Sequence, residues 1–328
     1  MLPIAVIYEN EAWMAPVFEA LDREGVPLER VFANTRAFDP AAPAPAWSLA
    51  VNKVSPSAYL REHAASIAFA REFLPFLEER RIPLVNGSDA FRLETSKALQ
   101  LLMLQRLRVR APASRVVSDR ARVAEAANGL RFPVIVKPNI GGSGALARRF
   151  ESVDAIREAA ASIDLGPGGI GLVQEYLEPA DGSIVRVEFL EGEILYAIKI
   201  WSDKTNDFNL CPADICQVPA PAGLVTGAVN ELTSTAAKKP MRIEAFDAPR
   251  EMTDAVLGIA REGKLDVGGV EYLVAARDGL PYVYDINALS NFVTDAVSLV
   301  GFDPHQRFAR YLIDRAREAD HPRRERAA

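Results

Sequence analysis

The stretch FPVIVKPNIGGSG, residues 132–144, says most about the fold of this 328-residue chain. Its first half is an apolar run typical of a buried β-strand, and the run ends at Lys137. Its second half is rich in glycine, which has no Cβ and lets backbone N–H groups approach a bound anion closely. A lysine at the end of such a strand can place its ammonium group over phosphates. A surface turn after an edge strand explains the stretch equally well when it is taken alone.

A second group of polar residues, Glu271, Asp285 and Asn287, lies towards the C-terminus. The Asp278-Gly279 pair between them is a strong hairpin signal, so Glu271 is expected beside the other two. Asp285 and Asn287 are two residues apart and face the same way in a strand. Two carboxylates and an amide oxygen suit Mg²⁺. A polar sheet face turned to solvent is the alternative, but the flanking apolar residues indicate a half-buried setting in which carboxylates need a partner.

The composition is that of an ordinary soluble globular protein, with 49% apolar and 25% charged residues. There are 38 Lys plus Arg and 44 Asp plus Glu, a formal charge of −6, which argues against nucleic acid as a partner. The first residues make a poor signal peptide, and no stretch approaches the roughly 20 apolar residues of a membrane span. Cys211 and Cys216 fit no common zinc spacing and are expected to be free thiols in a reducing cytosol.

Strands alternate with helices over residues 1–90, a pattern that predicts a parallel sheet with helices on its faces. Within this region we expect one long helix over residues 59–80, and a further helix over residues 94–107. Later apolar runs predict strands, two of which are joined by a Glu191-Gly192 turn. The charged tail from Arg315 is expected to fray.

Two familiar motifs are absent or misleading. The sequence GPGGIG, residues 166–171, matches a dinucleotide-binding pattern, but a helix precedes it and a strand follows, so it is expected to be a loop. No phosphate-binding P-loop sequence occurs. The three histidines, His63, His305 and His321, are far apart and none resembles a catalytic base or a metal ligand.

Taken in order, these segments resemble the ATP-grasp superfamily, and most of all its RimK-type and glutathione-synthetase-like branch. The similarity extends from about Asn86 to Phe302, and more loosely back to residue 1. It implies an α/β (α+β) ATP-grasp fold. The expected parts are an N-terminal parallel α/β domain over residues 1–90 and two ATP-grasp subdomains over residues 91–175 and 176–320.

The resemblance also implies roles for individual residues. Those expected to contact ATP are, in chain order, Lys97, Lys137, Gly141, Gly142, Ser143, Gly144, Gln174, Glu175, Tyr176, Leu177 and Arg186. Lys137 and Arg186 are expected to act on the transferring phosphoryl group. The glycines form a flap, and Glu175 and Leu177 read adenine through their backbone. Glu271, Asp285 and Asn287 are expected to hold two Mg²⁺ ions, which Mn²⁺ could replace.

The implied activity is an ATP-dependent carboxylate-amine ligase that forms an amide or peptide bond through an acyl phosphate. Its substrates are expected to be an amino acid or a peptide, in the cytoplasm, with no membrane or nucleic-acid partner and a homodimer as the common assembly of relatives. Three alternatives stay open. They are a ligase using a non-amino-acid carboxylate or another nucleophile, a nucleotide-binding regulatory module without turnover, and an NAD-linked oxidoreductase.

The sequence departs from the family at the site. The acidic residues at positions 271 and 285 are exchanged, Glu for Asp and Asp for Glu, and residues 288–291 replace a common Ser-Pro-Gly, so the family's substrate is not carried over. Further candidates are weaker. Lys53, Ser55 and Ser57 are candidates for a substrate carboxylate, Lys199, Lys204, Asn206 and Asn209 for the acyl group, and Asp181 or Glu178 for ribose.

Overall fold

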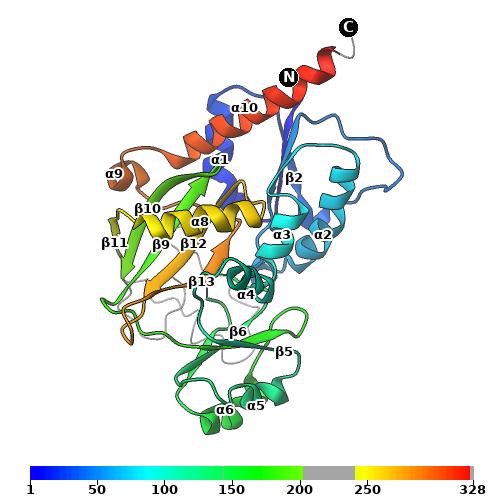
Figure 1. Ribbon diagram of the computed structural model, residues 1–328. Coiled ribbons are helices and arrows are strands. Elements are labelled where there is room, and N and C mark those ends of the chain that lie inside the picture. The colour runs from blue at the N-terminus through cyan, green and yellow to red at the C-terminus, as the bar shows by residue number, and fades with distance from the viewer. Residues whose placement is uncertain (143, 202–240, 326–328) are drawn as a thin grey trace.

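The structure is a computed structural model that describes residues 1–142, 144–201 and 241–325, with side chains to residue 320. Ser143, Lys204, Asn206, Asn209, Cys211 and Cys216 lie outside the described residues, as does the side chain of His321. Figure 1 shows three sheets, which follow one another along the chain, with helices packed on them. No helix in the described parts of the chain is both long and apolar enough to cross a membrane.

The first sheet is parallel, as expected, with the strand order β2-β1-β3-β4. Its strands are β1 (Ile4–Tyr8), β2 (Leu28–Phe32), β3 (Leu49–Lys53) and β4 (Leu84–Val85). All residues of β1 and β3 are buried because helices cover both faces. Alternate residues of β1 point to helix α1 (Glu11–Arg23) on one face and to helix α2 (Ala64–Glu79) on the other. At the carboxyl end of β3, Lys53 donates a hydrogen bond to the carbonyl oxygen of Ser290, which joins this sheet to the C-terminal part of the chain.

One expected helix is divided in the structure, and another begins later than expected. The helix expected over residues 59–80 is a short 3₁₀ turn, η2 (Ala58–Arg61), followed by α2, and Glu62 between them has a left-handed φ of 61°. The helix expected over residues 94–107 is present as α4 (Lys97–Arg106), and a separate helix, α3 (Ser88–Glu94), ends before it. The helix begins at Lys97 because Ser96 caps α4, its hydroxyl accepting a hydrogen bond from the Leu99 N–H at 3.3 Å. Lys97 therefore stands at the first position of a helix.

The second sheet is a small antiparallel one with the order β5-β8-β6-β7. Its strands are β5 (Ser114–Val117), β6 (Val134–Pro138), β7 (Arg148–Phe150) and β8 (Gly171–Glu175). Helices α5 (Val123–Ala126) and α6 (Val153–Ala159) cover one face, at the bottom of Figure 1. The glycine-rich segment at residues 166–171 leads from the 3₁₀ helix η4 (Ala160–Ser162) into β8, so it is the expected loop and no dinucleotide motif.

The third sheet is antiparallel with the order β11-β10-β9-β12-β13. Its strands are β9 (Ser183–Leu190), β10 (Glu193–Trp201), β11 (Arg242–Ala245), β12 (Val267–Val274) and β13 (Pro281–Asn287). The turns predicted at Glu191-Gly192 and Asp278-Gly279 are present. One face packs on helix α8 (Arg250–Glu262) through alternate apolar residues. The residues between them, including Arg186 and Glu271, therefore lie on the opposite face.

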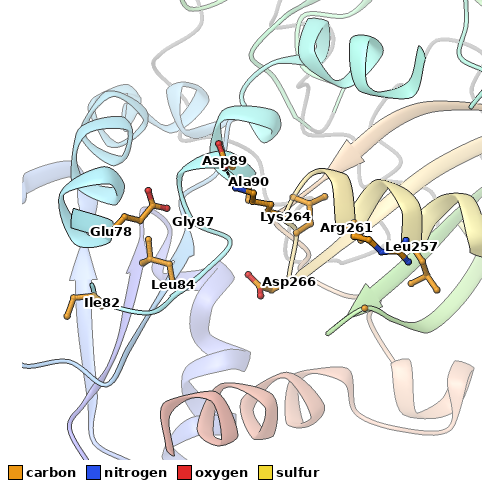
Figure 2. A pocket seen from close by; sticks show the side chains of 13 residues that line it. Glu78, Ile82, Leu84, Gly87, Asp89, Ala90, Leu257, Arg261, Lys264 and Asp266 are labelled. Carbon is orange, nitrogen blue, oxygen red and sulfur yellow. Dashed lines mark hydrogen bonds and ion pairs between the residues drawn. The ribbon is translucent and has the colours of Figure 1, made fainter. Parts of the chain in front are cut away.

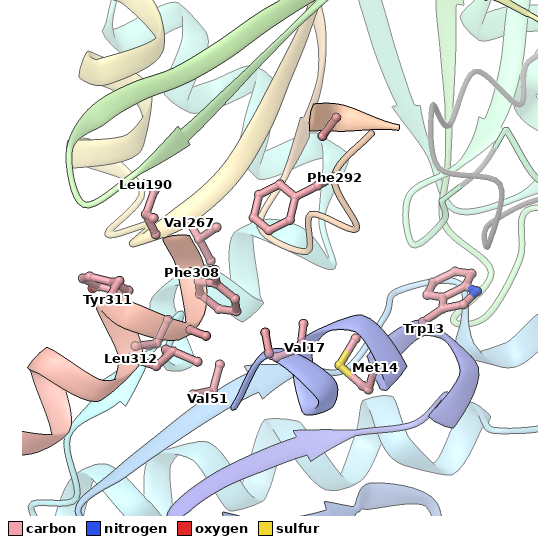
Figure 3. Close-up of a cluster of buried hydrophobic side chains, with 14 of the residues drawn as sticks. Trp13, Met14, Val17, Val51, Leu190, Val267, Phe292, Phe308, Tyr311 and Leu312 are labelled. Carbon is pink, nitrogen blue, oxygen red and sulfur yellow. The ribbon is translucent and has the colours of Figure 1, made fainter. Parts of the chain in front are cut away.

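The C-terminal region forms α9 (Ala296–Val300) and a long helix, α10 (Pro304–Glu325). The expectation that the tail frays from Arg315 was wrong, because α10 continues past it and packs against α1 near the N-terminus (Figure 1). Arg315 itself contacts Asp266 at 3.4 Å. Figure 3 shows the resulting core, in which Phe308 and Leu312 of α10 meet side chains of α1, β3, β9 and β12. One core thus joins both ends of the chain, and the domain limits 1–90, 91–175 and 176–320 stay a proposal.

Replacement of Phe308 by alanine is expected to lower the free energy of unfolding by about 3 to 5 kcal/mol. Its ring is 0% exposed at the centre of this core, so the change removes packing and leaves a cavity. Urea titration followed by tryptophan fluorescence measures the loss. Val297→Ala is the matched control, because that side chain is 62% exposed and should cost less than about 0.5 kcal/mol. Equal losses in the two variants would contradict the assignment of this core.

Candidate active site

A cleft of about 270 Å³ lies between the β5-β8-β6-β7 sheet and the β12-β13 edge of the third sheet. Most of the residues expected to bind ATP or metal line it. They are Lys97, Lys137, Gly141, Gly142, Gly144, Gln174, Glu175, Tyr176, Leu177, Glu271 and Asp285. Arg186 and Asn287 are not part of this lining, although they are close to residues that are. Arg186 of β9 lies opposite Glu271, and Asn287 of β13 follows Asp285 by two residues. Segments more than a hundred residues apart therefore meet in one cleft.

The two lysines are brought together by Asn139, which follows β6. Its carbonyl oxygen accepts a hydrogen bond from the Lys97 N–H at 3.2 Å, and its Oδ1 accepts one from the Ala98 N–H at 2.9 Å. These bonds fix the first turn of α4 against the end of β6. As a result Lys97 and Lys137 enter the cleft from two different elements.

The lysines differ in their electrostatic surroundings. Burial and, to a smaller extent, the neighbouring charge of Lys97 together lower the pKa of Lys137 to about 8, against the attraction of Asp285 and Glu271. Burial also lowers the pKa of Lys97, but an ion pair and hydrogen bond with Asp285 outweigh it and the pKa is raised. A polyanion in the cleft would stabilise both ammonium groups, since each is desolvated and close to the other.

The acidic residues take the arrangement predicted from the hairpin. Glu271 of β12 lies opposite Asp285 of β13, and Gly269 lies opposite Asn287. Among the described residues, no three His, Cys, Asp or Glu side chains come close enough to hold a metal by themselves. Two carboxylates and an amide fit Mg²⁺ all the same, because this ion is commonly held by one or two carboxylates together with substrate phosphate oxygens.

Arg186 is held by two carboxylates, one of which was missed in the sequence. Its Nη1 donates to Glu271 Oε1 at 2.7 Å, and its Nε donates to Glu188 Oε1 at 2.5 Å. Glu188 is 0% exposed. A signal for it existed, because Glu188 follows Arg186 by two residues in a strand and must share its face.

One wall of the cleft is apolar and suits a planar base. Leu177, Ile184, Ile200 and Leu273 line it beside the expected adenine hinge. The guanidinium of Arg149 lies 4.3 Å from the centre of the Tyr176 ring. Of the two ribose candidates, Glu178 lines the cleft, whereas Asp181 is outside the lining and is paired with Lys199 at 2.7 Å. This favours Glu178.

The candidates from the third strand lie inside the fold. Lys53 is 3% exposed and its Nζ donates to the carbonyl oxygen of Ser290 at 2.6 Å. The hydroxyls of Ser55 and Ser57 are 2.8 Å apart and buried. These contacts support the loop after Asn287 and the end of β3, so the structure gives them structural partners in place of an open carboxylate site.

Glu94, the last residue of α3, was not predicted as a residue of the site, because nothing in the local sequence marks it as buried. Its carboxylate accepts a hydrogen bond from the Ala288 N–H, one residue after Asn287. Burial raises the pKa of Glu94 to about 7, against this hydrogen bond and the charges of Lys97 and Arg186. The residue thus fixes the backbone next to the proposed metal asparagine.

A larger cavity, of about 620 Å³, lies elsewhere, between the α2-α3 region and α8 (Figure 2). Its three carboxylates and Lys264 are already paired. Lys264 contacts Asp89 at 2.7 Å, Glu78 accepts from the Ser88 N–H at 2.9 Å, and Asp266 accepts from the Asn86 N–H at 2.8 Å. Neither Lys97 nor Lys137 reaches it, so the smaller cleft is the candidate active site.

No family model matches the chain, and no curated protein matches its sequence. Solved structures do match over nearly the whole length. The ATP-grasp ligase PsnB, solved with a minimal precursor, has 18% identity and a TM-score of 0.65, with 96% of this chain and 100% of that chain covered. PsnB is also described with its minimal precursor, Mg and ADP.

Two further structures support the same comparison. The D-cycloserine synthetase DcsG has 18% identity and a TM-score of 0.66, over 95% of this chain and 99% of that chain. D-alanine–D-alanine ligase from Bacillus anthracis has 15% identity and a TM-score of 0.63, with 100% of both chains covered. At these identities the likeness establishes the fold. The chain therefore has the ATP-grasp fold that its sequence predicted.

Proposed function

We propose that this protein is an ATP-dependent, Mg²⁺-requiring carboxylate-amine ligase that forms an amide bond through an acyl phosphate. The supporting observation is the meeting of Lys97 and Lys137 with the Glu271–Asp285 pair in one cleft that also has an apolar wall. Two cations, two metal-binding carboxylates and a base-sized apolar surface are together what a nucleotide triphosphate with Mg²⁺ requires. The three neighbouring structures named above are two ligases and one synthetase, which agrees with this choice.

The proposed reaction has two steps, formation of an acyl phosphate and its reaction with an amine. A carboxylate oxygen of the substrate attacks the γ-phosphorus of ATP, the bond to the β-phosphate oxygen breaks, and ADP leaves. An amine nitrogen then attacks the acyl carbon, the carbon–oxygen bond to phosphate breaks, and the amine loses a proton. Lys97, Lys137 and Arg186 stabilise the negative charge on the transferring group by position and electrostatics, without a covalent intermediate on the protein.

Glu271, Asp285 and Asn287 would hold the metal. Mg²⁺ bound there supplies positive charge that stabilises the phosphate oxygens during transfer. The glycines at 141, 142 and 144 lie at the cleft beside these groups, and exclusion of water there would protect an acyl phosphate from hydrolysis. We place the reaction in the cytoplasm, where ATP and free amino acids or peptides are available as small-molecule partners.

The test is ADP release from ATP and Mg²⁺ with pooled amino acids, dipeptides and small carboxylates, with mass spectrometry on the same samples. We expect ADP release that depends on the pool, together with a new mass equal to acid plus amine minus water. ADP release without an amide mass would indicate another nucleophile or a hydrolysed acyl phosphate. Binding of ATP and Mg²⁺ without ADP release from any pool would favour a regulatory module and contradict the ligase assignment.

A further inference from the structure

Glu188 is a buried carboxylate that the mechanism above does not use. It lies on β9 opposite Gly269, while Arg186 on the same strand lies opposite Glu271. Arg186 and Glu188 share one face of the sheet, because the residues between and beside them, such as Val187, pack into the core on the α8 side. The two side chains are thus neighbours along the strand, directed towards the cleft side of the sheet.

The guanidinium of Arg186 is fixed along two edges. Nε donates to Glu188 Oε1 at 2.5 Å, and Nη1 donates to Glu271 Oε1 at 2.7 Å. A planar guanidinium bound at both edges cannot rotate about its long axis without losing one bond. Glu271 is also a proposed metal ligand, so Glu188 is the partner whose role is limited to the arginine.

Gly269 provides the space in which this pair lies. A Cβ built at this position would come within 2.8 Å of Arg186 Nη2 and 3.0 Å of Glu188 Oε1. Contacts that short are repulsive, so any side chain at Gly269 would displace the guanidinium. The glycine and the carboxylate therefore define one position for Arg186.

A contribution to the stability of the fold does not by itself explain why a carboxylate is buried at position 188. Burying an ion pair costs desolvation that usually offsets its attraction, so apolar residues of similar size stabilise a fold equally well. The second oxygen of Glu188, Oε2, is buried and has no hydrogen-bond partner among the described residues. The carboxylate lies in a setting that is unfavourable for the fold, which points to a role in the site.

We propose that Glu188 is a positioning residue that orients the guanidinium of Arg186 for phosphoryl transfer, with Gly269 keeping the space for it. This inference rests on the proposed function. It requires that Glu188 act on the reaction through Arg186. A purely structural role would instead lower the stability of the fold and leave kcat unchanged.

The test is a double-mutant cycle with Arg186→Ala, Glu188→Gln and the double variant. Glutamine keeps the size of Glu188 and removes its charge. We expect Glu188→Gln to lower kcat for ADP release by about 10- to 100-fold, as for partners that orient a functional group. The Kd of a non-hydrolysable ATP analogue with Mg²⁺ should rise by a smaller factor, about 3- to 10-fold. The double variant should have the same kcat and the same analogue Kd as Arg186→Ala alone, because Glu188 has no guanidinium left to orient.

Three outcomes overturn the inference. They are an unchanged kcat in Glu188→Gln, a double variant whose loss equals the product of the single losses, and a change confined to thermal stability. A wild-type protein that releases no ADP would contradict the proposed function itself, and analogue binding would then still test the coupling of the two residues.

A second variant serves if Glu188→Gln does not fold. Gly269→Ala keeps both charges and should lower kcat by displacing the guanidinium, with no further effect in the Arg186→Ala background. Gly258→Ala in α8 is the control, since a Cβ there meets nothing within 4 Å. Equal activity of the Gly269 and Gly258 variants would overturn the proposal.

Discussion

Replacement of Lys137 by alanine is expected to lower the rate of ADP release by at least about 10²-fold, the effect of removing one preorganised charge from a transition state. Lys137 is buried in the cleft beside Lys97, and no acidic group among the described residues is paired to it in the way that Asp285 is paired with Lys97. Its ammonium group is thus available for a phosphate. Initial rates at saturating ATP measure the effect. Lys264→Ala is the control, because that lysine is 73% exposed and contacts Asp89 away from the cleft.

The pH dependence of the same residue gives an independent check. Burial lowers the pKa of Lys137 to about 8, so kcat/KM should fall as the pH rises through that value. The pKa is lower in the folded protein than the 10.5 of an unperturbed lysine, so below about pH 8 the folded protein carries the full cost of a buried ammonium ion. Lys137→Met should therefore melt at a higher temperature than the wild type at pH 7, with the difference shrinking between about pH 8 and 10.5. A variant that is both inactive and less stable would contradict this account.

Replacement of Asp285 by alanine is expected to lower the Mg²⁺-dependent rate of ADP release by at least about 10²-fold. The reason is that metal stabilisation of the charge on the phosphoryl group contributes several kcal/mol. Asp285 lies opposite Glu271 across the hairpin and is paired with Lys97, so the change removes a metal ligand and leaves a buried lysine without its partner. Titration with Mg²⁺ or Mn²⁺ at fixed ATP should show that the Asp285→Ala variant needs a higher concentration of the ion than the wild type does.

A control for this variant is Asp254→Asn on α8. That carboxylate is 67% exposed and contacts Arg250 in the same helix, so its loss should leave the metal titration unchanged. Wild-type metal dependence in Asp285→Ala would contradict the assignment of the site. So would an equal loss in both variants.

The parts of the site that the sequence predicted depend on local patterns. Lys137 with its glycine loop is a strand followed by a turn, and the Asp278-Gly279 hairpin sets Glu271 opposite Asp285 through the two-residue period of a strand. The helix limits were predicted less well. The helix was expected to begin at Glu94, whereas the hydrogen bond that Ser96 Oγ accepts from the Leu99 N–H shows that α4 begins at Lys97.

Other features depend on contacts between distant segments, and the sequence pattern carries no sign of them. Lys97 pairs with Asp285 although 188 residues separate them. Glu94 is buried because Ala288 donates to it from the far end of the chain. The helix α10, which looks like a charged tail, is ordered by its packing on α1.

By itself, the sequence determined the parallel sheet at the N-terminus, the turns at Glu191-Gly192 and Asp278-Gly279, the resemblance that implied the ATP-grasp fold, and the residue types that enter the cleft. The tertiary structure alone decided which charges pair, that Lys53 is buried, and that Glu188 and Gly269 fix Arg186. The physical reason is that alternation along a strand sets the face on which a side chain lies. Its burial, its partner and its pKa are set by whatever element packs against that face.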